Sequence, residues 1–232
     1  MHTVVILHGW GQNKTFWAGA FTGVSDVSII IFDLPGFGAE PLPRDGADWG
    51  IPHYAAWVRE KIEKEKLDGV VLLGHSFGGR IAAHLAGERP SWLAALILYG
   101  APCVYRPSFS VRIKKKIARL AKVFSKFFGR MSGLSGGYRG NPELTEAEHG
   151  GRGGIFRRVV GYDQAEALKK ITVPTLIIWG EKDAVVPLRI AHEMSRLVSG
   201  SRLEVLPGLG HNAHIENPNL FYGVAKKFIE NF

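Results

Sequence analysis

Six short apolar runs punctuate the chain, and each has the length of a buried strand. Between most of them, apolar side chains recur every three or four positions, as they do along one face of an amphipathic helix. Strands that alternate with helices predict an α/β fold, a mostly parallel sheet with helices on both faces. The runs are residues 3–7, 27–32, 70–73, 93–98, 174–178 and 203–206. The clearest helical patterns cover residues 52–62, 81–86, 188–198 and 218–229.

One long interval, residues 101–173, breaks this alternation because it contains no convincing strand. It holds a helical pattern, then a glycine-rich tract, then two short helical patterns, and an unstructured loop of that length is uncommon in a compact domain. We therefore predict a core of residues 1–102 and 172–232 with a helical cap, residues 103–171, whose middle is mobile. Ligands bind beyond the carboxyl ends of the strands in open parallel sheets, so the cap should act as a lid there.

Composition narrows the class of protein. A chain of 232 residues with 46% hydrophobic residues can bury the core of one sizeable domain. The single cysteine, Cys103, excludes an internal disulfide framework, and the N-terminus lacks the pattern of a secretory signal. No apolar run reaches the ~18 residues of a membrane-spanning helix. We expect a cytoplasmic protein.

The stretch 70–80 carries the first chemical signal. An apolar strand runs into Gly-His-Ser-Phe-Gly-Gly, residues 74–79, before the helical pattern at Ile81. A serine on so tight a turn is lifted above the sheet edge with helix N–H groups beneath it, which makes Ser76 a candidate nucleophile. A phosphate-binding loop would need Lys followed by Ser or Thr where Arg80 and Ile81 stand. A plain tight turn stays open as an alternative.

A serine nucleophile needs a base and a group that orients the base, and both should follow later strands. After the run 174–178 come Trp-Gly-Glu-Lys-Asp, ending at Asp183, and after the run 203–206 come Pro-Gly-Leu-Gly-His, ending at His211. Both residues fall in loops at the carboxyl ends of strands. The chain order is therefore Ser, Asp, His.

With these residues in place, the chain resembles the α/β-hydrolase superfamily, in the branch that carries a helical cap. The resemblance implies that Ser76 is the nucleophile, Asp183 the orienting acid and His211 the general base. It also implies that the backbone N–H groups of Trp10 and Phe77 form the oxyanion hole. The motifs that carry it are HGWG (8–11), DLPGFG (33–38), GHSFGG (74–79), WGEKDAVVP (179–187) and GHNAHIENP (210–218).

The chain departs from the family pattern in two places. Relatives usually carry a strand pair before the HGWG loop, whereas Met1 nearly abuts it here, so we expect a sheet of about six strands without that N-terminal pair. The DLPGFG loop usually continues into a small residue and a serine, and here it continues into Ala39 and Glu40. The second departure bears on substrate fit near that loop.

Other titratable residues have simpler interpretations. His214 lies three residues beyond His211, but the family pattern places the base directly after the glycine. We expect His8 and His75 to shape their loops by hydrogen bonding, and Cys103 to be a small apolar residue. No residues have metal-ligand spacing and no dinucleotide fingerprint is present, so we expect neither a metal nor a cofactor.

The net charge of +8 belongs to one segment. Residues 104–130 carry nine basic residues and no acidic one, so the remainder sums to −1. This distribution, without any nucleic-acid-binding motif, argues against a nucleic-acid partner. The basic helix 111–128 could lie on an anionic membrane, but a cap helix over an apolar pocket needs the same pattern, and we favour the cap because family members carry their lids here.

The expected function is a carboxylesterase that cleaves small or medium esters through an acyl-enzyme, acting on small-molecule substrates. The serine nucleophile disfavours the aspartate-based dehalogenase and epoxide-hydrolase branches of the family. Alternatives are a carbon–carbon bond hydrolase of vinylogous diketones, a monoacylglycerol-type lipase if the basic helix touches lipid, and an inactive relative that only binds a ligand. The sequence makes no prediction of oligomeric state.

Overall fold

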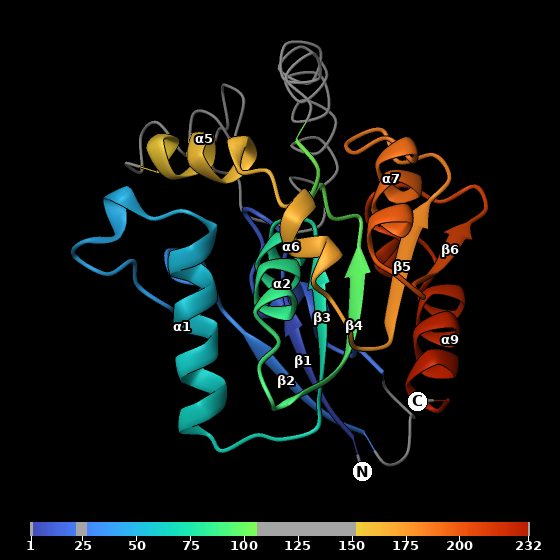
Figure 1. Ribbon diagram of the computed structural model, residues 1–232, viewed down its shortest axis with the longest axis horizontal. Coiled ribbons are helices and arrows are strands. Elements are labelled where there is room, and N and C mark those ends of the chain that lie inside the picture. Colours follow the sequence, from blue (N-terminus) through green and yellow to red (C-terminus); the bar gives the residue numbers. More distant parts are fainter. Residues whose placement is uncertain (1, 22–26, 106–151, 232) are drawn as a thin grey trace, which may run out of the picture.

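The computed structural model describes residues 2–21, 27–105 and 152–231, which build an open, six-stranded, wholly parallel sheet flanked by helices (Figure 1). The predicted fold class and strand count are confirmed. The strand order is β2-β1-β3-β4-β5-β6. The strands are β1 (His2–Leu7), β2 (Val27–Phe32), β3 (Val70–His75), β4 (Leu93–Tyr99), β5 (Thr175–Gly180) and β6 (Arg202–Leu206).

Each face of the sheet buries its own cluster of apolar side chains, because successive strand residues point to opposite faces. On β1, Val5 and Leu7 join the cluster under one helical layer, while Val4 and Ile6 join the other cluster. The first layer contains α1 (Ile51–Lys64), α2 (Phe77–Glu88), α6 (Ala165–Lys169) and α7 (Arg189–Leu197). The opposite layer contains η1 (Lys14–Trp17), α8 (Ala213–Glu216) and α9 (Pro218–Ile229).

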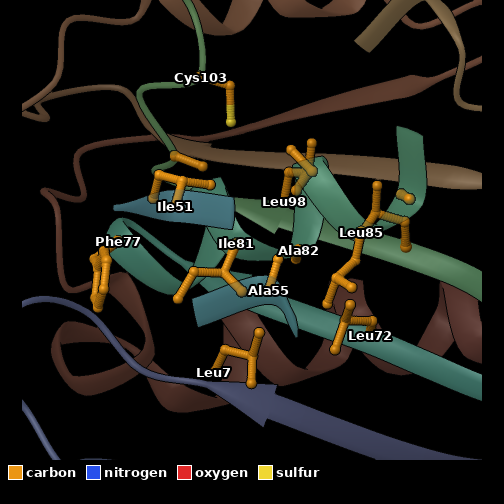
Figure 2. Packing of buried hydrophobic residues seen from close by; sticks show 14 of the residues in the cluster. Leu7, Ile51, Ala55, Leu72, Phe77, Ile81, Ala82, Leu85, Leu98 and Cys103 are labelled. Carbon is orange, nitrogen blue, oxygen red and sulfur yellow. The ribbon is translucent and has the colours of Figure 1, made fainter. Parts of the chain in front are cut away.

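Helix α2 is central to the first layer. Figure 2 shows Leu7, Leu72 and Leu98, from three adjacent strands, packed around Ile81 and Leu85 of this helix. All five side chains are fully buried, and burying an aliphatic side chain of this size contributes roughly 1.5–3 kcal/mol. Ser76, which directly precedes α2, is therefore attached to a helix that is firmly packed on the sheet.

The helix α2 begins at Phe77, earlier than the helical pattern predicted near Ile81. The two glycines at positions 78 and 79 suggested a turn, but they permit close packing instead. A Cβ on Gly78 would lie 2.2 Å from the carbonyl oxygen of Leu7, and one on Gly79 would lie 2.4 Å from Cβ of Ala101. These glycines let the first turn of the helix approach the strand ends.

The order in which the chain adds strands to the sheet reverses after β2, and this reversal brings two loops together. Strand β1 pairs with β2 on one side and with β3 on the other, and Leu7 of β1 lies opposite Gly74 of β3. The carboxyl ends of β1 and β3 therefore meet at a topological switch point, where open α/β sheets bind ligands. The loop 8–12, which follows β1, and Ser76, which follows β3, both lie at this switch point.

Part of the predicted cap is described. Its two short helical patterns are α5 (Gly153–Gly161) and α6, and Ile155 and Leu168 lie in the same buried cluster as α2. The basic helix 111–128 and the predicted mobile middle fall outside the described residues. The domain division at residues 103–171 stays a prediction. In the ranges that are described, no helix is long and apolar enough to cross a membrane.

Candidate active site

Ser76 occupies a strained turn between β3 and α2. Its backbone has φ 50° and ψ −107°, in the left-handed half of conformational space that costs a non-glycine residue roughly 1–3 kcal/mol. The turn is held because Ser76 N donates to the carbonyl of Tyr99 at 2.9 Å. A Cβ on Gly74 would lie 2.5 Å from the carbonyl oxygen of Gly78, so the turn closes only with glycine there. The side chain of Ser76 is half-buried.

Asp183 and His211 form a hydrogen-bonded pair in the loops after β5 and β6. Asp183 Oδ2 lies 2.7 Å from His211 Nδ1, and Asp183 Oδ1 accepts from the N–H groups of Val185 and Val186, both at 2.8 Å. The aspartate side chain is 1% exposed and that of the histidine 11% exposed. A carboxylate only accepts, so Nδ1 carries the proton and Nε2 keeps a lone pair in the neutral ring.

The His211 ring lies beside the end of β4, the neighbour of β3, and Ser76 directly follows β3. A Cβ on Gly100 would lie 3.1 Å from Cε1 of His211 and 3.7 Å from Oδ2 of Asp183. Gly100 directly follows Tyr99, whose carbonyl holds Ser76. Among the described residues, no hydrogen bond joins Ser76 Oγ to His211. The sheet thus gathers the three predicted residues at one edge, with the acid–base pair already hydrogen-bonded.

His214, the alternative base, lies in different surroundings. It is buried, stacks on Trp17 at 4.2 Å between ring centroids, and places Nδ1 3.4 Å from Tyr99 Oη. Burial, with the charge of His211 as a lesser cause, lowers the pKa of His214 to about 3. Asp183 is hydrogen-bonded to His211 and not to His214. The geometry therefore favours His211 as the base.

Trp10 and Phe77 each present a backbone N–H group near the switch point. Phe77 is the first residue of α2, where N–H groups lack intrahelical partners and the helix dipole is positive. Within the described part of the chain, neither N–H donates a hydrogen bond. The carbonyl of His8 accepts from Gly78 N at 3.1 Å, which fixes the loop after β1 against the start of α2.

The His8 side chain forms hydrogen bonds within the HGWG motif and with the DLPGFG motif. Its Nδ1 donates to the carbonyl of Gly9 at 2.8 Å, and its Nε2 accepts from the N–H of Leu34 at 3.0 Å. Burial lowers the pKa of His8 to about 4, so the ring is neutral at physiological pH. The prediction that His8 shapes its loop by hydrogen bonding is confirmed.

Sequence reasoning assigned no structural role to Arg80, because it considered this residue only as a departure from the lysine of a phosphate-binding loop. Its buried guanidinium donates to the carbonyls of Val159 and Tyr162, both at 2.8 Å, and of Val160 at 3.3 Å. These carbonyls lie at the C-terminal end of α5, where the helix dipole is negative and favours a cation. Burial lowers the pKa of Arg80 to about 10. Arg80 thus fastens α5 to the helix that follows Ser76.

Aromatic side chains surround the loop after β1. The Trp10 ring makes edge contacts with Phe37, Phe77 and Phe156, at 5.0, 5.2 and 5.1 Å between centroids. Phe156 comes from α5, so the contact of Arg80 with α5 also brings an apolar side chain to Trp10. The surroundings of the candidate oxyanion hole are apolar on this side.

Cys103 is buried beneath α2, with its sulfur 3.8 Å from the carbonyl oxygen of Gly79. Burial raises the pKa of the thiol to about 12, which keeps it protonated at physiological pH and disfavours a thiolate nucleophile. Across the described ranges, no group of three or more His, Cys, Asp or Glu side chains is placed to hold a metal ion.

Comparisons with known proteins identify the family of the chain. The model of the alpha/beta hydrolase family matches residues 4–224. The chain is 28% identical to an uncharacterized protein of Mycobacterium tuberculosis, with 98% of this chain and 75% of the relative covered. It is 26% identical to the pimeloyl-[acyl-carrier protein] methyl ester esterase of Aeromonas salmonicida, with 97% and 94% covered.

Among solved structures, the esterase EaEST of Exiguobacterium antarcticum superposes with a TM-score of 0.80 at 26% identity. This similarity covers 100% of this chain and 92% of that protein. The family match spans nearly the whole chain, including both strands that flank the switch point and the loops that bear Asp183 and His211. The chain therefore belongs to the alpha/beta hydrolase family and is a hydrolase.

Proposed function

We propose that this protein is a serine carboxylesterase that cleaves small or medium esters of apolar acids. The observation that carries the proposal is the 2.7 Å hydrogen bond between Asp183 and His211, placed at the same sheet edge as the strained turn of Ser76. A strained serine backbone is costly, and such strain persists chiefly where it has a function. The esterase names of the Aeromonas and Exiguobacterium relatives support the same class of reaction.

In the proposed mechanism, Ser76 Oγ attacks the ester carbonyl carbon while His211 Nε2 accepts the hydroxyl proton. Asp183 holds the imidazole in the tautomer with hydrogen on Nδ1 and stabilises the imidazolium that forms. The N–H groups of Trp10 and Phe77 donate to the oxyanion of the tetrahedral intermediate. His211 then returns the proton to the leaving alcohol, and an acyl-enzyme on Ser76 remains.

Hydrolysis of the acyl-enzyme repeats these steps with water as the nucleophile. His211 removes a proton from water, which attacks the acyl carbonyl, and Ser76 leaves as the protonated hydroxyl with the acid as product. The same N–H groups serve the second oxyanion. No metal or cofactor enters either half of the reaction.

The aromatic contacts of Trp10 support an apolar acyl or alcohol group in the substrate. Trp10 and Phe156 are both half-buried, and their rings lie 5.1 Å apart at the loop that bears the candidate oxyanion donor. A large apolar side chain that stays partly exposed can contact a ligand. The methyl ester in the name of the Aeromonas relative adds a simple candidate for the alcohol group.

The test is an ester panel measured with wild type, Ser76→Ala and Ser91→Ala. The panel runs from p-nitrophenyl acetate to the octanoate and includes dimethyl pimelate and one vinylogous diketone. Ser91 is exposed and serves as a matched control that loses a hydroxyl at the surface. We expect ester hydrolysis by wild type and Ser91→Ala, and a loss of roughly 10³- to 10⁶-fold in Ser76→Ala. Preferred turnover of the diketone would replace the ester proposal, and no turnover at all would favour a ligand-binding relative.

A further inference from the structure

Gln12 contacts three of the loops that build the candidate active site. Its Oε1 accepts from the N–H of Gly9 at 2.9 Å, within the loop that also bears Trp10. The same atom lies 3.2 Å from Nδ1 of His75, the residue directly before Ser76. Its Nε2 donates to Oδ1 of Asn212 at 3.3 Å, directly after His211. One half-buried amide thus lies between the candidate oxyanion donor, nucleophile and base.

The other nitrogen of His75 extends this network to the base itself. His75 Nε2 lies 3.0 Å from the carbonyl oxygen of His211, and Tyr99 Oη donates to the same carbonyl at 2.7 Å. A neutral imidazole carries one N–H, so His75 donates either to this carbonyl or to Gln12 Oε1 and not to both. The Tyr99 hydroxyl fixes the carbonyl of His211, and the ring of His75 stacks on that of Tyr99 at 4.5 Å between centroids. The residue before the nucleophile therefore lies between the amide of Gln12 and the main chain of the base.

The packing around Gly9 is arranged for this contact. A Cβ on Gly9 would lie 3.0 Å from Gln12 Oε1 and 3.1 Å from His75 Nδ1. Both distances are tighter than ordinary carbon contacts, so a side chain here would push the amide away from the imidazole. The glycine leaves room for the Gln12 amide to lie against the backbone that leads to Trp10.

Gln12 takes no part in the proposed proton transfers. It is half-buried and lies in the loop after β1, outside the helices and strands. Each of its three contacts is with a residue adjacent in sequence to a candidate catalytic residue: Gly9 precedes Trp10, His75 precedes Ser76, and Asn212 follows His211. We infer that Gln12 is a positioning residue for the proposed ester hydrolysis: through Gly9, His75 and Asn212 it holds the oxyanion loop in register with the nucleophile and the base. The inference rests on the proposed function.

The test substitutes Gln12→Met, which keeps the length of the side chain and removes both hydrogen-bonding atoms. Asn13→Ala is the matched control, because it removes a side-chain oxygen from the adjacent residue that, among the described residues, accepts only from Thr15. Ser76-dependent hydrolysis of p-nitrophenyl butyrate is established first, as the difference between wild type and Ser76→Ala. kcat, KM and Tm are then measured for each variant.

We expect kcat of Gln12→Met to fall roughly 10- to 100-fold, since misplacing a donor by about an ångström costs this much. KM should change less than about threefold and Tm by only a few degrees, while Asn13→Ala keeps kcat within about twofold of wild type. Asn212→Ala removes the third contact and should lower kcat in the same direction by a smaller factor. The double variant should lose no more than Gln12→Met alone, because the two changes break one network.

Three results would overturn the inference. A kcat for Gln12→Met within twofold of wild type would mean that the loops keep their register without the amide. An equal fall in Asn13→Ala would mean that any loosening of this loop has the same effect. If Gln12→Met does not fold, an unchanged kcat in Asn212→Ala contradicts the inference by itself. Hydrolysis that survives Ser76→Ala would instead remove the proposed function.

Discussion

Asp183 Oδ2 and His211 Nδ1 are 2.7 Å apart, although 28 residues separate them in the chain. The sheet explains this proximity. Strands β5 and β6 are adjacent and parallel, with Gly180 opposite Leu206, so the loops that follow them begin side by side (Figure 1). The N–H groups of Val185 and Val186 then direct the carboxylate of Asp183 from one side while His211 occupies the other.

This pairing predicts the effect of removing the charge on Asp183. Asp183→Asn should lower kcat/KM for ester hydrolysis by roughly 10²- to 10⁴-fold, because an amide no longer favours the tautomer of His211 with hydrogen on Nδ1. Glu181→Gln is the control: Glu181 accepts from Gly208 N and does not contact the imidazole. Steady-state kinetics on one ester checks both. Comparable losses in the two variants would contradict the role assigned to Asp183.

The two neighbouring histidines should differ in the same assay. His211→Ala should lower kcat roughly 10³-fold or more, since no group then accepts the serine proton. His214→Ala should lower Tm, because it removes a buried ring that stacks on Trp17, and should change kcat far less. Full activity in His211→Ala together with inactivity in a folded His214→Ala would reverse the assignment of the base.

Arg80 should matter for stability through α5. Arg80→Met should lower the free energy of unfolding by about 2 kcal/mol or more, because it leaves the carbonyls of Val159 and Tyr162 without their charged donor. Arg80→Lys keeps the charge but offers a single nitrogen, so an intermediate loss is expected. Urea unfolding measures both. Wild-type stability in Arg80→Met would mean that α5 is held by its apolar contacts alone.

Three buried histidines predict a loss of stability in acid. Burial lowers the pKa of His8 to about 4, of His214 to about 3, and of His75 well below its ordinary value of 6.5. Below pH 6.5 the unfolded chain binds protons that the folded protein does not, so the free energy of unfolding falls as pH falls. The expected slope is about 1.4 kcal/mol per pH unit for each histidine.

Urea unfolding at pH 7.5, 6.5, 5.5 and 5.0 measures this slope. His214→Phe keeps a ring against Trp17 and removes one titrating group, so its slope below pH 6.5 should be about one third smaller. Above pH 7 both proteins should show little dependence on pH from these groups. A free energy of unfolding that stays constant between pH 7.5 and 5.0 would contradict the buried neutral state of the three rings.

The sequence predicted most of what depends on local pattern. Uniformly apolar runs identified all six strands. The predicted site residues Ser76, Asp183 and His211 follow the carboxyl ends of β3, β5 and β6, as expected. The observed strands extend further than predicted: His75 and Tyr99 end β3 and β4, because their backbones pair whatever side chain they carry. The start of α2 was placed too late, since glycines needed for close packing look like turn residues in a sequence.

Contacts between distant loops could not be predicted in this way. Gln12 meets His75 and Asn212 only because β1 and β3 are neighbours and because the loop after β6 returns to the same edge. Arg80 reaches the end of α5 from a helix 79 residues earlier in the chain. No periodicity or motif marks either contact, because each depends on how loops from separate elements meet.

The central claim is that Ser76 is the nucleophile, and covalent labelling with a fluorophosphonate tests it most directly. The wild-type protein is incubated with the probe at pH 7.5, digested, and analysed by mass spectrometry, while residual ester hydrolysis is followed in parallel. We predict one phosphonylated residue, Ser76, with hydrolysis lost in proportion to labelling, and no labelling of Ser76→Ala. Modification at another residue, or ester hydrolysis that persists after Ser76 is fully labelled, would contradict the account.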